Sequence, residues 1–184
     1  MPSNLSTYNN DWFKNEIGAG KLKQLLWYFI NVLFFINPLN PFSSIKRMLL
    51  KSFGAKLGEG VLIKPSVNIK YPWKLVIGNH CWIGEGVWID NLAKVTLGNN
   101  VCLSQGAMLL TGNHNYKKAS FDLVLGEILL DDGVWIGAKA MVCPGITCAS
   151  HAVLSAQSVA TRNLESYTIY QGNPAIAIKK REIE

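Results

Sequence analysis

The chain has 184 residues, of which 49% are hydrophobic and 16% charged, a composition that predicts one folded domain and excludes an intrinsically disordered protein. Its formal net charge of +6 and pI near 9.2 favour acidic partners such as phosphates, anionic lipid or nucleic acid, without identifying one. The four cysteines include no CxxC pair and the three histidines are scattered, so we expect free thiols, no zinc finger and no metal site.

Residues 1–56 are expected to form a helical segment. The start "MPSNLSTYNNDWFKNE" lacks a basic stretch followed by an apolar core, so we expect no signal peptide. Residues 22–36 are apolar and aromatic, but these 15 residues fall short of the ~20 that a helix needs to span a bilayer. A second helix is predicted over residues 44–53, with Ser43 or Ser44 as its N-cap and Gly54 after its end.

The second helix is expected to be amphipathic. Its predicted apolar face carries Ile45, Met48, Leu49 and Phe53, and its predicted solvent face carries Lys46, Arg47 and Lys51. Two interpretations of residues 1–56 remain open and are compatible: the helices cover an open end of the core, or their aromatic surface rests in a membrane interface beside basic residues.

From residue 57 onward an apolar residue returns every six positions, with two slips of two residues and one long interruption. Neither a helix nor an ordinary β-meander has this period, whereas a short strand followed by a tight corner does. Many of these residues are followed by glycine, which suits a corner with unusual dihedral angles or close backbone approach. The repeating residues are Leu57, Ile63, Ile69, Ile77, Ile83, Ile89, Leu97, Leu103, Leu109, Leu130, Ile136, Val142, Cys148, Leu154 and Ala160.

Three such units close one triangular coil, and stacked coils place their strands in parallel around a continuous apolar core. We therefore predict an all-β parallel β-helix of about five coils over residues 57–178. The coils are expected to begin at Leu57, Ile77, Leu97, Leu130 and Cys148.

The long interruption begins after the stretch "LLTGNHNY", which contains His114. Residues 115–129 are predicted to leave the coil as a loop, and long loops in compact folds are more often functional than idle. His114 is expected at a corner, pointing away from the core. A histidine placed there could act as a general base.

The stretches "IGNHCWIGEGVWID", "IGAKAMVCPGIT" and "TGNHNY", with the closing "YQGNPA", resemble the hexapeptide-repeat acyltransferases, and in particular their sugar O-acetyltransferase branch. The apolar leader is similar to that of colanic-acid-type exopolysaccharide acetyltransferases. The resemblance covers residues 57–178. It implies a left-handed β-helix, although parallel crossovers are normally right-handed.

The resemblance further implies a homotrimer with acetyl-CoA bound between neighbouring subunits and no metal or nucleic acid. The reaction would be acetylation of a sugar hydroxyl, on a lipid-linked or nucleotide-linked saccharide of surface-polysaccharide synthesis. Such an enzyme would be cytoplasmic, and could work at the inner face of the membrane.

By the same resemblance, His114 is the general base. Asp90 stands where the family has a substrate-binding asparagine, and the neighbouring Asn91 leaves open which of the two orients the hydroxyl. Trp135 matches an indole that packs against the substrate or the pantetheine arm.

The residues expected to border coenzyme A are Ala138, Ala156 and Thr161. Residues 179–184 are expected to form a basic tail, in which Lys179 and Lys180 would contact the nucleotide phosphates.

Three alternatives are kept. A serine or amino-sugar acetyltransferase would share the fold and the donor. A γ-type carbonic anhydrase needs three histidines converging at a subunit interface, whereas His80 and His114 occupy different positions of the repeat. A β-helix without activity would have no use for His114, Asp90 and Trp135.

Overall fold

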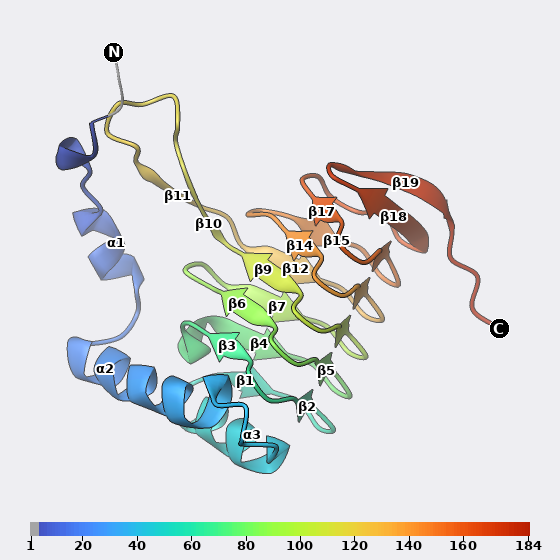
Figure 1. Ribbon diagram of the computed structural model, residues 1–184, viewed down its shortest axis with the longest axis horizontal. Coiled ribbons are helices and arrows are strands. Elements are labelled where there is room, and N and C mark those ends of the chain that lie inside the picture. Colours follow the sequence, from blue (N-terminus) through green and yellow to red (C-terminus); the bar gives the residue numbers. More distant parts are fainter. Residues whose placement is uncertain (1–3) are drawn as a thin grey trace.

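The computed structural model describes residues 4–184, which form a three-sided parallel β-helix with helices packed at its N-terminal end (Figure 1). Face A contains β1 (Lys56–Leu57), β4 (Leu75–Ile77), β7 (Val95–Leu97), β12 (Ile128–Leu130) and β15 (Thr147–Cys148). Face B contains β2 (Leu62–Ile63), β5 (Trp82–Ile83), β8 (Cys102–Leu103), β13 (Trp135–Ile136), β16 (Val153–Leu154) and β18 (Thr168–Gly172). Face C contains β3 (Asn68–Ile69), β6 (Trp88–Asp90), β9 (Met108–Leu110), β14 (Met141–Val142) and β17 (Val159–Ala160).

The parallel pairing aligns the repeating apolar residues of successive coils. Ile77 pairs with Leu97 on face A, and Ile83 pairs with Leu103 on face B. Since alternate residues of a strand point to opposite sides, the paired residues all point inward and are buried. The five coils begin where the six-residue period predicts, and β18 adds part of a sixth.

The corner glycines are explained by close backbone approach. A Cβ atom on Gly78 would lie 2.6 Å from the carbonyl carbon of Gly98 in the next coil, a distance that real Cβ atoms do not reach. The left-handed backbone conformation falls two residues later, at His80 and Asn100. The glycine that follows the apolar repeat residue is therefore required by stacking and not by its own dihedral angles.

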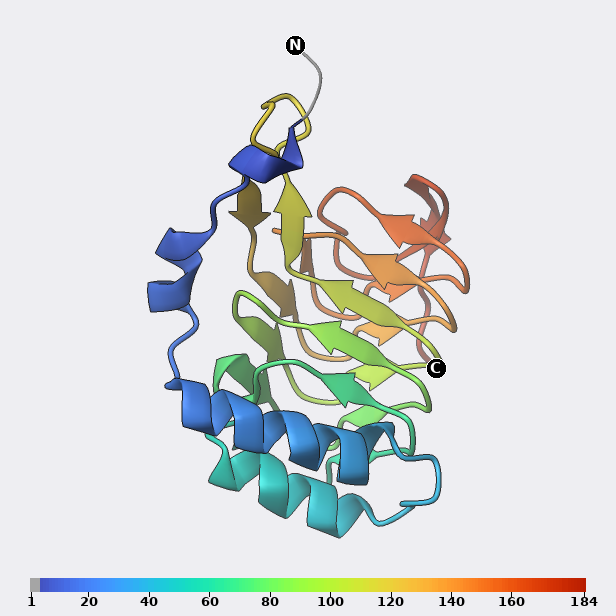
Figure 2. The same cartoon turned by 60° about the vertical axis from the view of Figure 1, so that its left-hand side comes forward.

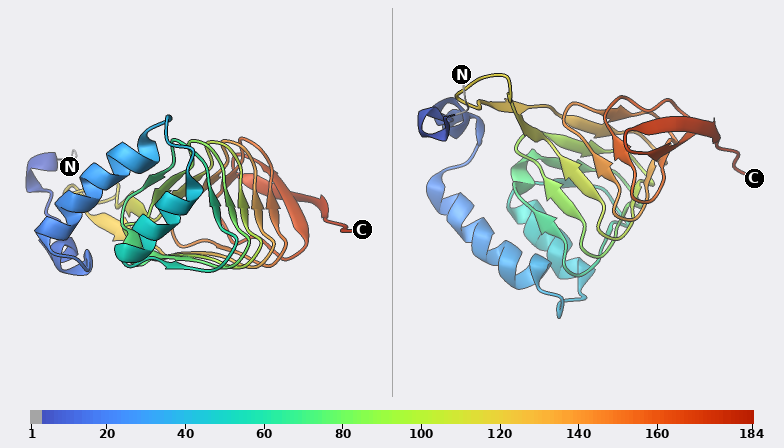
Figure 3. Two further views of the ribbon diagram at one scale, coloured as in Figure 1. Left: turned by 90° about the horizontal axis from the view of Figure 1, so that it is seen from below. Right: turned by 45° about the horizontal axis from the view of Figure 1, so that its top comes forward.

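The helices η1 (Leu5–Thr7), α1 (Asp11–Glu16), α2 (Lys21–Ile30) and α3 (Ser43–Ser52) precede the coils, and a π-helical segment, η2 (Asn31–Ile36), extends α2. Viewed from two further directions, α2 and α3 lie across the first coil (Figures 2 and 3). Trp27 donates a 2.8 Å hydrogen bond from Nε1 to the carbonyl of Ile69 in β3. Asn31 of η2 donates one of 2.8 Å to Asn68.

The predicted faces of the second helix are confirmed at Leu49, Phe53 and Lys51 but wrong at Lys46 and Met48. Lys46 is fully buried, and its ammonium donates a 2.7 Å hydrogen bond to the carbonyl of Lys64, whereas Met48 is 62% exposed. Ser43 does not cap the helix, because its hydroxyl accepts a 2.9 Å hydrogen bond from the amide of Ile63. The guanidinium of Arg47 donates another to the carbonyl of Val61. The first coil has no coil below it, so its edge offers backbone polar groups that need partners. Polar side chains of α3 supply them.

The interruption of the repeat is an antiparallel hairpin, called the arm below, formed by β10 (Gly112–His114) and β11 (Leu123–Leu125). The predicted loop boundaries of 115 and 129 are wrong, because the chain leaves the coil at Gly112 and rejoins face A at Ile128. His114 accordingly lies on the first strand of the arm and not at a corner of the coil. Figure 1 shows the arm projecting from the coils toward the N-terminal segment.

The C-terminal residues also differ from the predicted tail. The strand β19 (Ala175–Lys180) returns antiparallel along β18, so Lys179 and Lys180 belong to a hairpin and the tail begins at Arg181.

Adjacent leucines of β12 test the inward and outward alternation. Leu130 is fully buried and Leu129 is 38% exposed. Replacing Leu130 with Ala should lower the free energy of unfolding by about 2–5 kcal/mol through lost burial and a cavity. The same change at Leu129 should cost less than about 1 kcal/mol. Chemical denaturation measures both, and equal losses would contradict the described register.

Candidate active site

The imidazole of His114 has a defined orientation. Its Nδ1 lies 2.8 Å from the carbonyl oxygen of Phe121, and its ring stacks on the Phe121 ring at 4.4 Å with an angle of 6° between the planes. A carbonyl can only accept, so Nδ1 carries the proton and Nε2 of the neutral ring keeps its lone pair. That arrangement is what a general base requires.

Two residues outside the sequence motif hold His114. Phe121 has a left-handed backbone (φ 52°), which is uncommon for an aromatic residue and belongs to the turn that presents both its ring and its carbonyl to His114. Tyr8 is the second ring partner of His114: its ring centroid lies 5.6 Å from that of the imidazole. The N-terminal segment reaches the arm tip, where the amide of Asn4 donates to the carbonyl of Ala119. Neither contact has a local sequence signal.

Asp90 lies at the corner between faces C and A, one coil below the root of the arm. Thr111, at that root, donates to the Asp90 carbonyl from both its amide and its hydroxyl. The Asp90 carboxylate oxygen Oδ1 is buried 3.1 Å from the ammonium of Lys70 and makes no aligned hydrogen bond. Asp90 and Lys70 both line the cavity described next.

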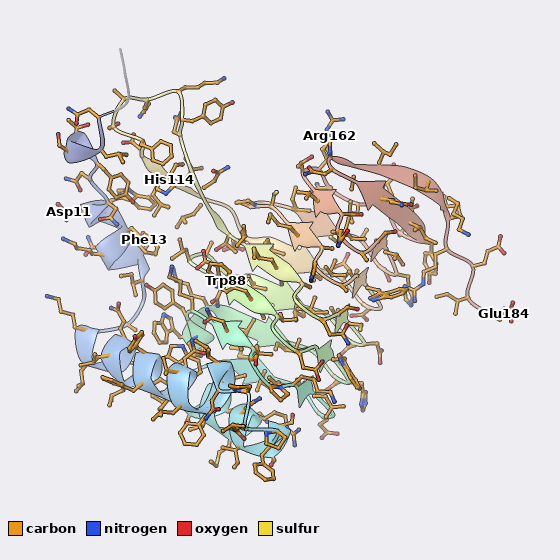
Figure 4. The ribbon with its side chains drawn as sticks, viewed as in Figure 1. Asp11, Phe13, Trp88, His114, Arg162 and Glu184 are labelled. Atoms are coloured by element: carbon orange, nitrogen blue, oxygen red, sulfur yellow. The ribbon has the colours of Figure 1, made fainter. Side chains whose placement is uncertain are left out.

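A cavity of about 350 Å³ opens beside Asp90, between the N-terminal helices and face C. Trp27, Tyr28, Tyr71 and Trp88 supply aromatic walls, and Asn31, Asn68 and Lys70 supply polar groups. Burial and the nearby Asp90 carboxylate raise the pKa of Tyr71, so its hydroxyl stays protonated as a donor. Figure 4 shows Trp88 on the coils and His114 on the arm.

The prediction that Asn91 contacts substrate is wrong. Its side chain is fully buried, accepts a 2.9 Å hydrogen bond from the amide of Tyr71 and donates one of 2.6 Å to the Tyr71 carbonyl. Both ends of the amide are therefore committed to holding the preceding coil. Of the two neighbours, only Asp90 is presented to the cavity.

A second cavity, of about 530 Å³, lies along face B and contains three of the predicted residues. Trp135 is 46% exposed there and donates a 2.9 Å hydrogen bond from Nε1 to Ser104. Ala138 and Ala156 occupy equivalent corners of successive coils, where their small side chains leave the backbone accessible. We call this space the face B cavity.

Basic residues adjoin the face B cavity. Lys179, Lys180 and Arg181 line a neighbouring space of about 330 Å³, and Arg181 borders both. Arg181 donates a 2.9 Å hydrogen bond to the carbonyl of Gly133, which fixes its guanidinium at this position. Thr161 is exposed at the corner between faces C and A and is not among the residues of either space.

Within one chain the arm and the face B cavity lie on different sides of the coils. The arm leaves the corner between faces C and A, which is opposite face B in a three-sided prism. Figures 1 and 2 agree, with the arm on one side and β18–β19 on the other. His114 and Trp135 therefore do not meet within one copy.

The fold and the sequence were compared with known proteins. No model of a protein family matches the chain. The crystal structure of the hexapeptide-repeat containing acetyltransferase VCA0836 from Vibrio cholerae has a TM-score of 0.80 at 20% identity, covering 90% of this chain and 96% of that one. The "Putative colanic acid biosynthesis acetyltransferase WcaF" of Escherichia coli is 32% identical over 164 residues, which are 89% of this chain and 90% of that protein.

This chain belongs to the hexapeptide-repeat acetyltransferases. The predictions of an acyltransferase and of a left-handed parallel β-helix with an N-terminal helical segment are confirmed. A galactoside acetyltransferase in complex with coenzyme A is another structural neighbour, with a TM-score of 0.76 at 21% identity over 88% of this acetyltransferase and 82% of that chain.

The contribution of Phe121 to this acetyltransferase can be separated from that of His114. Phe121→Gly keeps the carbonyl and suits the left-handed backbone but removes the stacked ring. We expect kcat to fall about tenfold because the imidazole orientation is less restricted. Tyr116→Ala, at an exposed aromatic position of the same arm, is the control in steady-state kinetics. If the Phe121→Gly enzyme were as fast as the wild type, the Phe121 ring would have no role in orienting His114.

Proposed function

We propose that the protein is an acetyl-CoA-dependent O-acetyltransferase that acetylates a hydroxyl of a saccharide, with His114 as general base. The observation that carries this proposal is the hydrogen bond from His114 Nδ1 to the Phe121 carbonyl, which leaves Nε2 free on an arm whose root, Thr111, bonds to Asp90 in the wall of a polar, aromatic cavity. The related galactoside acetyltransferase and the colanic acid relative support a saccharide acceptor for polysaccharide synthesis.

The chemistry is a direct transfer. Nε2 of His114 takes the proton of the acceptor hydroxyl while its oxygen attacks the thioester carbonyl carbon. The tetrahedral intermediate then expels the coenzyme A sulfur, which takes the proton from Nε2 as the ester forms. No cysteine is needed as a nucleophile, and burial raises the pKa of Cys148 to about 12, far from a reactive thiolate.

The face B cavity would hold the donor. The pantetheine arm is long and narrow, so it needs small side chains such as Ala138 and Ala156 beside accessible backbone. Lys179, Lys180 and Arg181 would pair with the phosphates at the end of the cavity. The bound coenzyme A of the galactoside acetyltransferase neighbour supports this donor.

The cavity beside Asp90 would hold the acceptor. Sugar rings offer apolar faces for aromatic stacking and hydroxyls for polar side chains, and this cavity provides Trp88 and Tyr71 with Asp90 and Asn68. The Asp90 carboxylate, paired with Lys70, would accept a hydrogen bond from a hydroxyl and so orient it.

We infer that the working enzyme is a homotrimer in which the arm of one copy meets the face B cavity of its neighbour. The support is geometric: these two parts lie on different sides of one chain, and a three-sided prism can repeat the same contact around a threefold axis. Because the donor would be acetyl-CoA, such an enzyme would work on the cytoplasmic side of the membrane.

Removing the base should abolish most of the transfer. His114→Asn should lower kcat by roughly 10²–10⁴-fold, the usual contribution of a general base. The measurement is release of the coenzyme A thiol from acetyl-CoA with a panel of sugars, amino sugars and serine. His80→Asn is the matched control, since His80 lies at a corner between faces A and B. Full turnover in His114→Asn would exclude the proposed base, and faster transfer to amines would exclude the hydroxyl acceptor.

Filling the donor cavity should weaken donor binding. Ala156→Phe places a ring where the pantetheine arm would lie, so KM for acetyl-CoA should rise at least tenfold. Arg162→Phe is the control, because Arg162 holds the equivalent corner position after the next strand and lies outside the cavity. An unchanged KM in Ala156→Phe would place the donor elsewhere.

A further inference from the structure

The outward side of α2 and η2 is covered by large apolar side chains. Helices on the surface of globular proteins normally place polar residues there, and contiguous apolar surface of this kind marks an interaction site. The exposed fractions on this side are substantial: Leu22 70%, Leu25 54%, Leu26 49%, Tyr28 61%, Phe29 53%, Val32 40%, Leu33 59% and Ile36 39%.

The opposite side of the same helices is already packed. Trp27 and Phe35 are buried against the first coil, and Asn31 is hydrogen-bonded to Asn68. The outward residues therefore cannot turn inward without breaking these contacts. Figures 2 and 3 show α2 and α3 side by side at the N-terminal end of the coils. We call the outward side of α2 and η2 the apolar helix face.

The N-terminal segment that carries this face has basic residues and no acidic ones. Between Glu16 and Glu59 the chain carries six Lys and Arg residues and no Asp or Glu. Lys46 points inward, but Lys21, Lys51 and Lys56 are exposed. In the part of the chain that the structure describes, none of these three forms a salt bridge. A surface that combines apolar side chains with unpaired positive charge is complementary to anionic lipid headgroups over an acyl interior.

The helices are too short to cross a bilayer. Within residues 4–184 no helix has the length and apolar character of a membrane span. Together α2 and η2 extend for about 24 Å at 1.5 Å per residue, less than the ~30 Å hydrocarbon thickness. Along their whole length, one side of these helices is packed on the coils and the other side is apolar and exposed. This arrangement suits a helix that lies in the plane of the membrane interface.

We propose that the apolar helix face docks the protein on the surface of a membrane that contains anionic lipid. Leu22, Leu26, Phe29 and Leu33 enter the headgroup boundary, while the lysines contact lipid phosphates. A second copy related by a twofold axis is the less suitable occupant, because a contact of this face with itself would bring two basic, acid-free segments together.

Docking through this face would place the cavity beside Asp90 at the membrane surface. Tyr28, Val32 and Ile36 belong both to the apolar helix face and to the wall of that cavity. A ligand of the cavity would therefore enter next to the bilayer. The proposal itself concerns the surface and stands independently of which reaction the cavity serves.

Co-sedimentation of the full chain with vesicles tests the proposal. Vesicles of phosphatidylcholine alone are compared with vesicles in which about a third of the lipid is phosphatidylglycerol. The wild type should bind the anionic vesicles, lose binding as salt is raised, and bind the neutral vesicles at least tenfold more weakly. Phe29→Glu/Leu33→Glu should weaken binding to the anionic vesicles at least tenfold.

The matched control is Leu5→Glu/Ile183→Glu, which adds the same charge at two apolar residues that are 67% and 57% exposed and lie outside α2 and η2. The control should bind anionic vesicles nearly as well as the wild type. Circular dichroism should show both variants folded. Equal binding by Phe29→Glu/Leu33→Glu and the control would overturn the proposal. So would a failure of the wild type to bind, or a loss of oligomeric state in Phe29→Glu/Leu33→Glu on a sizing column, which would assign the face to another copy.

Discussion

The structure depends on one constraint, the parallel hydrogen-bond ladder that stacks each coil on the one before. Because the ladder keeps register, a residue at a given corner lies directly above its counterpart, as the Gly78 and Gly98 positions show. The same constraint places the root of the arm over Asp90, where Thr111 bonds to the Asp90 carbonyl, and Ala138 beside Ala156. The stacking of the repeat, which buries the apolar core, therefore also fixes where the residues of the candidate site lie.

A stacked ladder leaves its first coil without a partner, and this gives the N-terminal helices their role in the fold. Lys46, Ser43 and Arg47 of α3 bond to backbone groups of that coil, while Trp27 of α2 bonds to Ile69. The side of α3 that faces the first coil therefore carries the polar Lys46, whereas apolar periodicity predicted Met48 there. Covering the coil also leaves the outward side of α2 exposed, and that side is the proposed membrane surface.

The sequence predicted the parts that depend on local period and missed those that depend on distant contacts. The coil starts followed from inward residues at fixed spacing, and Trp135, Ala138 and Ala156 do share a cavity. His114 was placed at a corner because nothing local indicates that Gly112 pairs with Leu125. Asn91 looked available because its partner, Tyr71, lies a full coil earlier. Phe121 reaches His114 only because the arm folds back as a hairpin, and Tyr8 only because the N-terminal segment packs against the arm.

The central claim is that an active site is completed by two copies, with His114 from one and the face B cavity from the next. Mixing His114→Asn and Ala156→Phe chains, co-refolded into shared assemblies, tests it most directly. At an acetyl-CoA concentration where each variant alone is nearly inactive, the mixture should recover about a quarter of the wild-type turnover, since that fraction of random interfaces pairs two intact halves. Turnover no greater than the average of the separate variants would contradict the account.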